Sequence, residues 1–172
     1  MQPKALILTA DGFEDSELLY PFYRLQEAGY TVDIAAPTAG EVTGKHGYTV
    51  TANLGLGDVP LHASHGYRLL LVPGGKAPAV LRENPKAPHI ARDFAGSKAI
   101  LAAICHGPQV LIASGLLRGK RATCSASMAE ELKAAGVFYQ DAEVVVDGRF
   151  ITSRKPADLP AFMREVMAKL EE

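Results

Sequence analysis

A cysteine followed by a histidine ends an apolar run near the middle of the chain, in the stretch AILAAICHGPQVL (residues 99–111). In a nucleophile elbow, a tight turn between a strand and a helix exposes the nucleophile, and the residues two before and two after it must be small. Ala103 and Gly107 hold these positions around Cys105. Pro108 then suits the first turn of a helix. The pattern favours a reactive thiol over a buried structural cysteine.

The start of a helix also changes the acidity of a thiol placed there. Unpaired backbone N–H groups and the helix dipole stabilise an anion at that end of a helix. Such a position lowers a thiol pKa from ~8.5 into the range of roughly 3.5–7.5. We therefore expect Cys105 to react as a thiolate.

A base for the thiol is harder to assign from the sequence. Adjacent residues on a sharp turn point in different directions, so the position of His106 beside Cys105 does not guarantee contact. The five histidines are His46, His62, His65, His89 and His106. None follows His106, which excludes a triad whose histidine comes much later in the chain. The base is therefore His106, a histidine from the 46–65 region, or absent.

Other groups suited to such chemistry also lie close to apolar runs. Gly74 and Gly75 follow one run, and their N–H groups could stabilise a developing oxyanion together with an elbow N–H; a plain turn is the alternative. Glu14 stands at the start of a helical pattern, where a carboxylate commonly interacts with the helix dipole. The sharper alternative is that Glu14 faces the thiol, which requires a raised carboxyl pKa. Cys124 is either a resolving thiol or, as we favour, a buried spectator.

The elements that must position these groups alternate along the chain. Short aliphatic runs alternate with longer helical patterns, which indicates a mostly parallel sheet with helices on both faces, a three-layer α/β sandwich. Buried strands are predicted at residues 4–10, 31–37, 67–75 and 99–105, helices at 14–29, 85–97, 108–117, 128–135 and 158–172, and β-hairpins at 42–53 and around Asp147-Gly148. Ligands bind at the carboxyl ends of such strands. That rule brings residues 10–14, 73–76 and 105–108 together.

Two helices carry signals for where they begin. Pro21 lies inside the first helical pattern and predicts a bend or a late start, because proline lacks the backbone donor that a helix interior needs. Ser127 and Glu130 form a capping-box pattern for the helix over 128–135. In that pattern the serine hydroxyl caps the first turn of its own helix.

The composition excludes several classes of protein. The 172 residues are 48% apolar and 22% charged, as expected for one globular domain spanning 1–172. A formal net charge of −1 offers no case for nucleic acid or an anionic membrane as partner. No apolar run approaches the ~20 residues of a membrane span, and no signal peptide is recognisable. We therefore expect a cytoplasmic protein with reduced cysteines and, lacking a Cys/His cluster, no metal or other cofactor.

Several segments resemble one known family. ADGFEDSELLYP, VTGKHGY, LVPGGKAP, AICHGPQVL, AGVFYQDAEVVVDG and ITSRKPADLPAFMRE occur in the order typical of PfpI-type intracellular proteases, a branch of the ThiJ/PfpI superfamily. The resemblance covers nearly the whole chain. It implies a flavodoxin-like sandwich related to class I glutamine amidotransferase domains. It also implies kinship with bacterial stress proteins and protein deglycases.

The resemblance implies a role for each site residue. Cys105 corresponds to the nucleophile, His106 to its partner, and Glu14 to the carboxylate that contacts the thiol. Gly75, next to Gly74, would form the oxyanion site with the backbone of His106. Proteins of this branch form homodimers or larger homo-oligomers such as hexamers, with the site near a subunit interface.

One position departs from the protease-like pattern. There, a neighbouring subunit supplies the third triad residue, a carboxylate just after the GG-x-A-P turn, where this chain has Ala79. Alanine cannot orient an imidazole, and loss of such a carboxylate costs about 10⁴-fold in Ser-His-Asp enzymes. Glu83 could substitute only if its helix presents it inward.

These residues lead to an expected function and its alternatives. We expect a cysteine-dependent hydrolase that acts on small carbonyl adducts, of deglycase or glyoxalase type, or weakly on peptides. The alternative is a redox or stress sensor that works through oxidation of Cys105. A chaperone would leave the elbow unexplained and ranks last.

Overall fold

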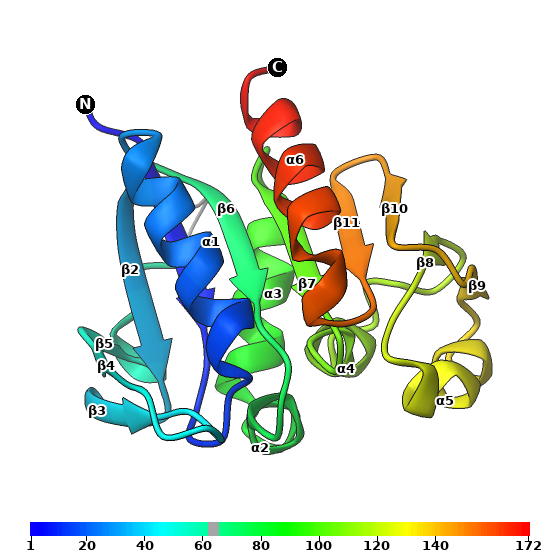
Figure 1. The fold of residues 1–172 in the computed structure, drawn as a ribbon, viewed down its shortest axis with the longest axis horizontal. Coiled ribbons are helices and arrows are strands. Elements are labelled where there is room, and N and C mark those ends of the chain that lie inside the picture. Colours follow the sequence, from blue (N-terminus) through cyan, green and yellow to red (C-terminus); the bar gives the residue numbers. More distant parts are fainter. Residues whose placement is uncertain (62–65) are drawn as a thin grey trace.

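The computed structural model describes residues 1–61 and 66–172, and its centre is a seven-stranded sheet (Figure 1). All neighbouring strands of this sheet are parallel except the edge strand β10, which runs antiparallel to β11. In spatial order the strands are β10 (Val144–Asp147), β11 (Phe150–Ser153), β7 (Ile100–Ile104), β6 (Tyr67–Val72), β1 (Lys4–Leu8), β2 (Thr31–Ala36) and β5 (Leu54–Gly55).

Helices cover both faces of the sheet, which confirms the predicted three-layer α/β sandwich. The helices are α1 (Asp15–Glu27), α2 (Ala77–Glu83), α3 (Lys86–Ala95), α4 (Pro108–Ala113), α5 (Ala129–Ala134) and α6 (Leu159–Leu170). Figure 1 shows α1 and α6 in front of the sheet and α3 behind it. Helices α2 and α4 contact α3 and each other. Within the described ranges, no helix is both long and apolar enough to cross a bilayer.

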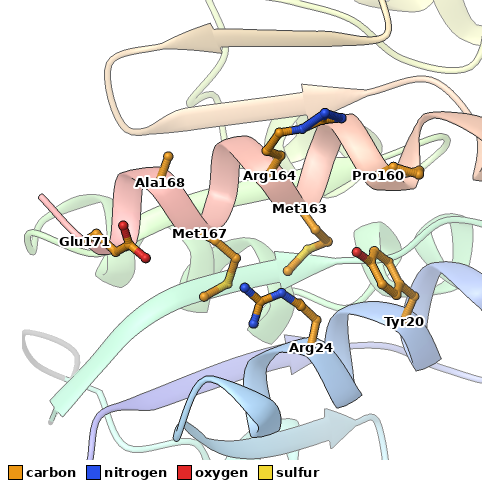
Figure 2. Close-up of a pocket in the computed structure, with 8 residues that line it drawn as sticks. All are labelled: Tyr20, Arg24, Pro160, Met163, Arg164, Met167, Ala168 and Glu171. Atoms are coloured by element: carbon orange, nitrogen blue, oxygen red, sulfur yellow. The ribbon is translucent and has the colours of Figure 1, made fainter.

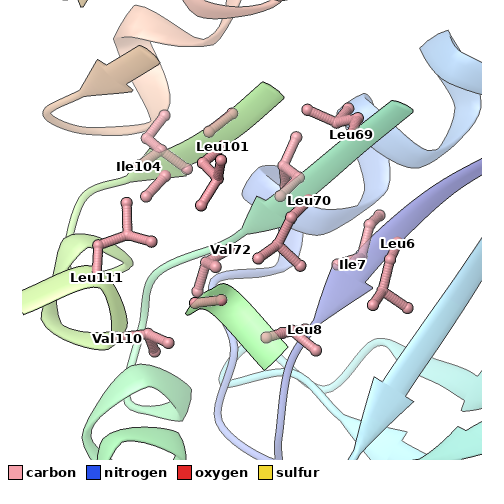
Figure 3. Packing of buried hydrophobic residues seen from close by; sticks show 14 of the residues in the cluster. Leu6, Ile7, Leu8, Leu69, Leu70, Val72, Leu101, Ile104, Val110 and Leu111 are labelled. Carbon is pink, nitrogen blue, oxygen red and sulfur yellow. The ribbon is translucent and has the colours of Figure 1, made fainter. Parts of the chain in front are cut away.

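The central strands are apolar along their whole length because they are buried on both faces. Every residue of β7 is buried, as is every residue of β1 except the first. Figure 3 shows side chains of β1, β6 and β7 packed together with Val110 and Leu111 of α4. This packing fixes the carboxyl ends of three neighbouring strands relative to one another.

One antiparallel pair and one short parallel pair lie outside the seven-stranded sheet. Strands β3 (Gly40–Thr43) and β4 (Thr49–Ala52) form the hairpin predicted at 42–53, and β10 pairs with β11 around the predicted Asp147-Gly148 turn. Strand β8 (Arg121–Ala122) pairs with β9 (Phe138–Tyr139).

The structure corrects two predictions about helix starts. Helix α1 begins at Asp15 with Pro21 in its interior, so the late start is wrong; Pro21 is buried and only removes the donor for the carbonyl of Glu17. The capping box is also wrong, because α5 begins at Ala129 without a side-chain cap. The 3₁₀ turn Ala126–Met128 occupies the residues before it.

Helix α2 lies between the predicted third strand and the helix predicted at 85–97, in a stretch for which we predicted no element. Its seven residues span less than two turns, so the apolar period is too short to recognise. It begins directly after the Gly74–Gly75 turn, and its buried residues pack it beside the site.

Candidate active site

Cys105 follows β7 on a strained turn. Its φ of +64° makes it the one non-glycine residue with positive φ in the described part of the chain. Such a conformation costs about 1–3 kcal/mol and persists only where the surroundings enforce it. Its N–H donates to the carbonyl of Ser153 at 3.0 Å, and its carbonyl accepts from the N–H of Ser125 at 2.9 Å. These two bonds fix the backbone of the turn that carries the thiol.

Gly107 is required by the same turn. A Cβ at this position would lie 2.2 Å from the carbonyl oxygen of Val72 and 2.9 Å from that of Ile104. No side chain fits between these backbones. The turn thus has the geometry of a nucleophile elbow, with Ala103 fully buried two residues before the cysteine.

His106 contacts the thiol directly. Its Nδ1 lies 3.3 Å from Cys105 Sγ, and both side chains are partly buried. Of the other candidates for a base, His46 lies on Glu14, with 3.2 Å between Nε2 and Oε1. His62 and His65 lie outside the described residues. Of the candidate bases that the sequence left open, the structure therefore places His106 in contact with Cys105.

The carboxyl group that faces the thiol belongs to Glu17, and the prediction of Glu14 for this place is wrong. Glu17 is fully buried, and its Oε1 accepts a 2.9 Å hydrogen bond from the N–H of Gly74. Burial, opposed by that bond, raises the pKa of Glu17 from 4.5 to about 8. The carboxyl also hydrogen-bonds with the Cys105 thiol. At neutral pH Glu17 is therefore mostly protonated.

Helical phase was the signal that could have identified Glu17. It lies four residues before buried Pro21 and eight before buried Leu25, so it occupies the face of α1 that packs on the sheet. A carboxyl group on a core-facing stripe needs a partner there. Glu14 precedes the first helical residue and has extended backbone angles.

Glu14 instead holds a loop beside the site. Its Oε2 lies 2.7 Å from Lys45 Nζ. The carboxylate of Asp15 fixes the same loop, because it accepts 3.0 Å hydrogen bonds from the N–H groups of His46 and Tyr48. Lys45 thereby comes close enough for its charge to act on Glu17 and on the Cys105–His106 pair. The chemical motifs gave no signal for Lys45.

Two backbone N–H groups point at the sulfur atom. They belong to Gly75 and His106, and both favour the thiolate. Gly75 must be glycine because its φ is +81° and a Cβ would lie 2.4 Å from the nitrogen of Glu14. The N–H of Gly74 is bonded to Glu17, so the prediction of Gly74 as an oxyanion donor is wrong. Gly75 and His106 are the pair able to hold an oxyanion.

The thiol is less acidic than the sequence predicts. Burial, followed by the charge of Glu17, raises the pKa of Cys105 to about 11 in spite of the N–H groups of Gly75 and His106. Helix α4 has only six residues, so its dipole is small beside the cost of burying an anion. Burial and Lys45 lower the pKa of His106 below its ordinary 6.5. The resting site thus pairs a thiol with a neutral imidazole.

Two serines complete the surroundings of this pair. Ser127 Oγ lies 3.1 Å from His106 Nε2 and 3.1 Å from Ser125 Oγ. The hydroxyl of Ser125 hydrogen-bonds with Cys105 and lowers its pKa against the effect of burial. No sequence pattern predicts either serine in the site, and Ser127 matches the pattern of a helix cap instead.

The remaining candidates lie apart from the chemistry. Ala79 is exposed on α2, and the Glu83 side chain is 82% exposed beside Arg82, so Glu83 is not turned inward. Cys124 is fully buried, and burial raises its pKa to about 12. Among the residues described, no three His, Cys, Asp or Glu side chains form a metal-binding group.

A surface groove of about 480 Å³ lies elsewhere, between α1 and α6. Figure 2 shows Tyr20 and Arg24 of α1 facing Met163 and Met167 of α6 across it. The thiol does not line this groove. The reactive residues instead follow the carboxyl ends of β6 and β7, which Figure 1 shows close to α2 and α4.

Fold and site together define an α/β sandwich protein with an elbow cysteine at the carboxyl edge of its parallel sheet. Residues 3–169 match the DJ-1/PfpI family, and the chain belongs to it. The resemblance seen in the sequence is thereby confirmed.

Similar proteins include two curated archaeal relatives named deglycases. A Thermococcus kodakarensis deglycase is 45% identical over 97% of this chain and 99% of its own length. The Pyrococcus furiosus deglycase PfpI is 44% identical over 98% of this chain and 99% of its own. Among solved structures, a two-domain Anabaena variabilis protein with DJ-1/ThiJ/PfpI-like and ferritin-like domains has a TM-score of 0.93 and 34% identity. That match covers 99% of this chain and 48% of the other, about half its length.

Proposed function

We propose that the protein is a cysteine-dependent deglycase that removes small carbonyl compounds from amines and thiols. The observation that carries the proposal is the contact of Cys105 Sγ with His106 Nδ1 at 3.3 Å, together with the hydrogen bonds from the N–H groups of Gly75 and His106 to the same sulfur. The deglycase names of relatives about 45% identical support the substrate class.

The first step moves a carbon from nitrogen to sulfur. In a methylglyoxal adduct, the carbinol carbon is bonded to the amine of a lysine side chain or a similar group. His106 takes the thiol proton as Cys105 Sγ bonds to that carbon and the carbon–nitrogen bond breaks. The leaving amine accepts the proton from His106. The products are the free amine and a hemithioacetal on Cys105, with all atoms accounted for.

The second step is an internal redox rearrangement. A proton moves from the carbinol carbon to the neighbouring carbonyl carbon through an enediolate, which turns the hemithioacetal into a thioester. The N–H groups of Gly75 and His106 stabilise the enediolate oxygen, and Glu17, with its pKa of about 8, carries the proton near neutral pH. Water then hydrolyses the thioester to a hydroxy acid and restores the thiol.

The site supports the alternative functions less well. Peptide cleavage needs a long-lived imidazolium to protonate the leaving amine, and no carboxylate contacts His106 among the described residues. A peroxide sensor needs an acidic, accessible thiol, whereas the pKa of Cys105 is raised to about 11. We place the protein in the cytoplasm as a homodimer or larger homo-oligomer that acts on small adducts, with weak action on peptides at most.

The test is release of free amine from the methylglyoxal adduct of N-acetyl-lysine, followed by NMR. We expect Cys105→Ala and His106→Ala to lower the rate by at least ~10²-fold, because each removes one partner of the proton transfer. Cys124→Ala is the matched control and should retain wild-type turnover. Undiminished turnover in Cys105→Ala would overturn the proposal.

One design feature separates adduct cleavage from consumption of the free aldehyde. The adduct is in equilibrium with methylglyoxal, so the assay is repeated with a scavenger that keeps the aldehyde low. A rate that persists identifies the adduct as substrate. A rate that falls with the free aldehyde identifies a glyoxalase instead and contradicts the deglycase assignment.

A further inference from the structure

A closed ring of hydrogen bonds surrounds the thiol and the imidazole. His106 Nε2 lies 3.1 Å from Ser127 Oγ, and Ser127 Oγ lies 3.1 Å from Ser125 Oγ. The Ser125 hydroxyl bonds with Cys105, whose Sγ lies 3.3 Å from His106 Nδ1. Only two segments form the ring, the elbow and the stretch from Ser125 to Ser127.

The ring fits one assignment of hydrogens that prepares the reaction. A neutral imidazole donates from one nitrogen and accepts at the other. With the hydrogen on Nε2, His106 donates to Ser127, Ser127 donates to Ser125, Ser125 donates to the sulfur, and the thiol donates to Nδ1. Each group then donates once and accepts once around the ring.

The reverse direction also closes the ring but blocks the reaction. There Nδ1 carries the hydrogen, the thiol donates to Ser125, and the imidazole cannot take the thiol proton. The productive direction pairs the most acidic donor of the ring, the thiol, with its strongest acceptor, the imidazole nitrogen. The backbone N–H groups of Gly75 and His106 also donate to the sulfur, so neither group competes with Nδ1 for the thiol hydrogen.

The start of α5 supports a role for Ser127 outside its own helix. The sequence places this serine where its hydroxyl would cap the first turn. The hydroxyl makes no such bond, and α5 begins uncapped. The Ser127 hydroxyl hydrogen-bonds with the imidazole of His106 instead, although Ser127 is exposed at the edge of the site.

We propose that Ser127 is the positioning residue of the thiol–imidazole pair, which it holds with Ser125 in the tautomer that has hydrogen on Nε2. The inference rests on the proposed role of Cys105 as nucleophile. Every member of the ring belongs to the same chain.

The same ring accommodates proton transfer without reorientation. Once Nδ1 has taken the thiol proton, the imidazolium donates from both nitrogens, and Ser125 already donates to the thiolate. No hydroxyl has to rotate. Two charged groups act on His106 in opposite directions, since Lys45 disfavours the imidazolium and Glu131, held by Arg82 of α2, favours it. A neutral hydroxyl therefore sets the orientation, and more distant charges set the pH range.

The test measures alkylation of Cys105 by iodoacetamide from pH 6 to 9, with the modified residue identified by mass spectrometry. We expect Ser127→Ala to slow alkylation at pH 7 about tenfold and to flatten its rise with pH, because the imidazole is no longer held as the base. Ser127→Thr keeps the hydroxyl and should restore the rate to within about twofold. Ser97→Ala removes a hydroxyl bonded to Phe94 and Ala99, so it serves as the control with wild-type behaviour.

A second measurement needs no destabilising variant. The ¹⁵N shifts of the wild-type imidazole should show an unprotonated Nδ1 and a protonated Nε2 at neutral pH. A hydrogen on Nδ1, or a wild-type rate and pH profile in Ser127→Ala, would overturn the inference. If Ser127→Ala does not fold, the inference is tested by the tautomer of the wild-type imidazole and by the alkylation rate of Ser127→Thr.

The two proposals can fail separately. Alkylation requires no biological substrate, so Ser127-dependent alkylation without turnover of adducts would sustain the inference and refute the deglycase assignment. Turnover of adducts that is insensitive to Ser127 would do the opposite.

Discussion

Cys105 and Glu17 are two acids that share one buried space, and that fact governs the chemistry of the site. Burial raises the pKa of each group, to about 11 and about 8. Both groups therefore resist ionisation at neutral pH, and when one loses its proton the other keeps its own. The thiol becomes a nucleophile through transfer of its proton to His106, because a standing thiolate is too costly in this environment.

Glu17 should make the stability of the protein depend on pH. The folded chain keeps a carboxyl proton that the unfolded chain releases above pH 4.5. The free energy of unfolding should thus fall as pH rises from 4.5 to about 8, by a few kcal/mol at most, and then level off. Glu17→Gln, whose amide oxygen can still accept from Gly74, should lack this fall. Urea denaturation at pH 5, 7 and 9 checks the difference; parallel curves for both proteins would contradict it.

Lys45 should control the acidic limit of activity. The pKa of His106 lies below 6.5, through burial first and Lys45 second, so the imidazole remains a base until the pH falls through that lowered value. Removal of the charge in Lys45→Gln should shift the acidic limb of Cys105 alkylation to higher pH. The control is Lys98→Gln, an exposed residue just before β7. An unmoved limb in Lys45→Gln would show that this charge does not reach the imidazole.

At the scale of elements, close contacts with neighbouring backbone restrict the turn from β7 into α4 to one conformation. The turn passes so close to β6 that Gly107 approaches the carbonyl of Val72 without space for a methyl group. The same approach brings Cys105 against the Gly74–Gly75 turn that follows β6. Steric exclusion therefore both forces the positive φ of Cys105 and delivers the N–H donors to its sulfur.

Gly107→Ala tests that restriction. The added Cβ would meet backbone oxygens at 2.2 and 2.9 Å, so we expect a loss of more than about 2 kcal/mol in unfolding free energy and loss of thiol reactivity. Gly96→Ala is the matched control at the end of α3. Its nearest contact would be 3.4 Å and its φ is −72°, so the change should stay within about 1 kcal/mol. Equal stability of the two variants would show that the elbow can relax.

At the scale of the whole molecule, the strand order determines which loops can meet. The chain passes from β1 to β2 on one side and from β6 to β7 on the other, so the order reverses between β1 and β6. Ligand sites form at such switch points. Here α1 delivers Glu17, the turn after β6 delivers Gly75, and β7 delivers Cys105, three segments far apart in the sequence.

The hydrogen-bond ring lies within one chain, which leads to a prediction about assembly. We expect light scattering to find a homodimer or larger oligomer, and dilution to dissociate it. The second-order rate constant for alkylation of Cys105 should stay constant per chain across that transition, because the base is oriented by Ser127 of the same subunit. A rate that falls in step with dissociation would mean that a neighbouring subunit completes the site.

Local patterns in the sequence determined the sandwich, the elbow and the position of its cysteine. Buried parallel strands must be apolar along their length, and the elbow requires small residues beside Cys105, so both features are legible in short stretches. The same holds for Gly75, whose conformation only glycine adopts without strain.

Only the tertiary structure decided which side chains meet the thiol and how acidic it is. Glu17 rather than Glu14 faces the thiol because of how α1 is oriented on the sheet. The hydroxyl of Ser127 bonds with His106 rather than with its own helix because the fold brings the imidazole within reach. The pKa of Cys105 is set by burial among segments distant in the sequence. Short stretches specify conformation, whereas contacts and desolvation arise from the whole fold, and the reactivity of this cysteine depends on both.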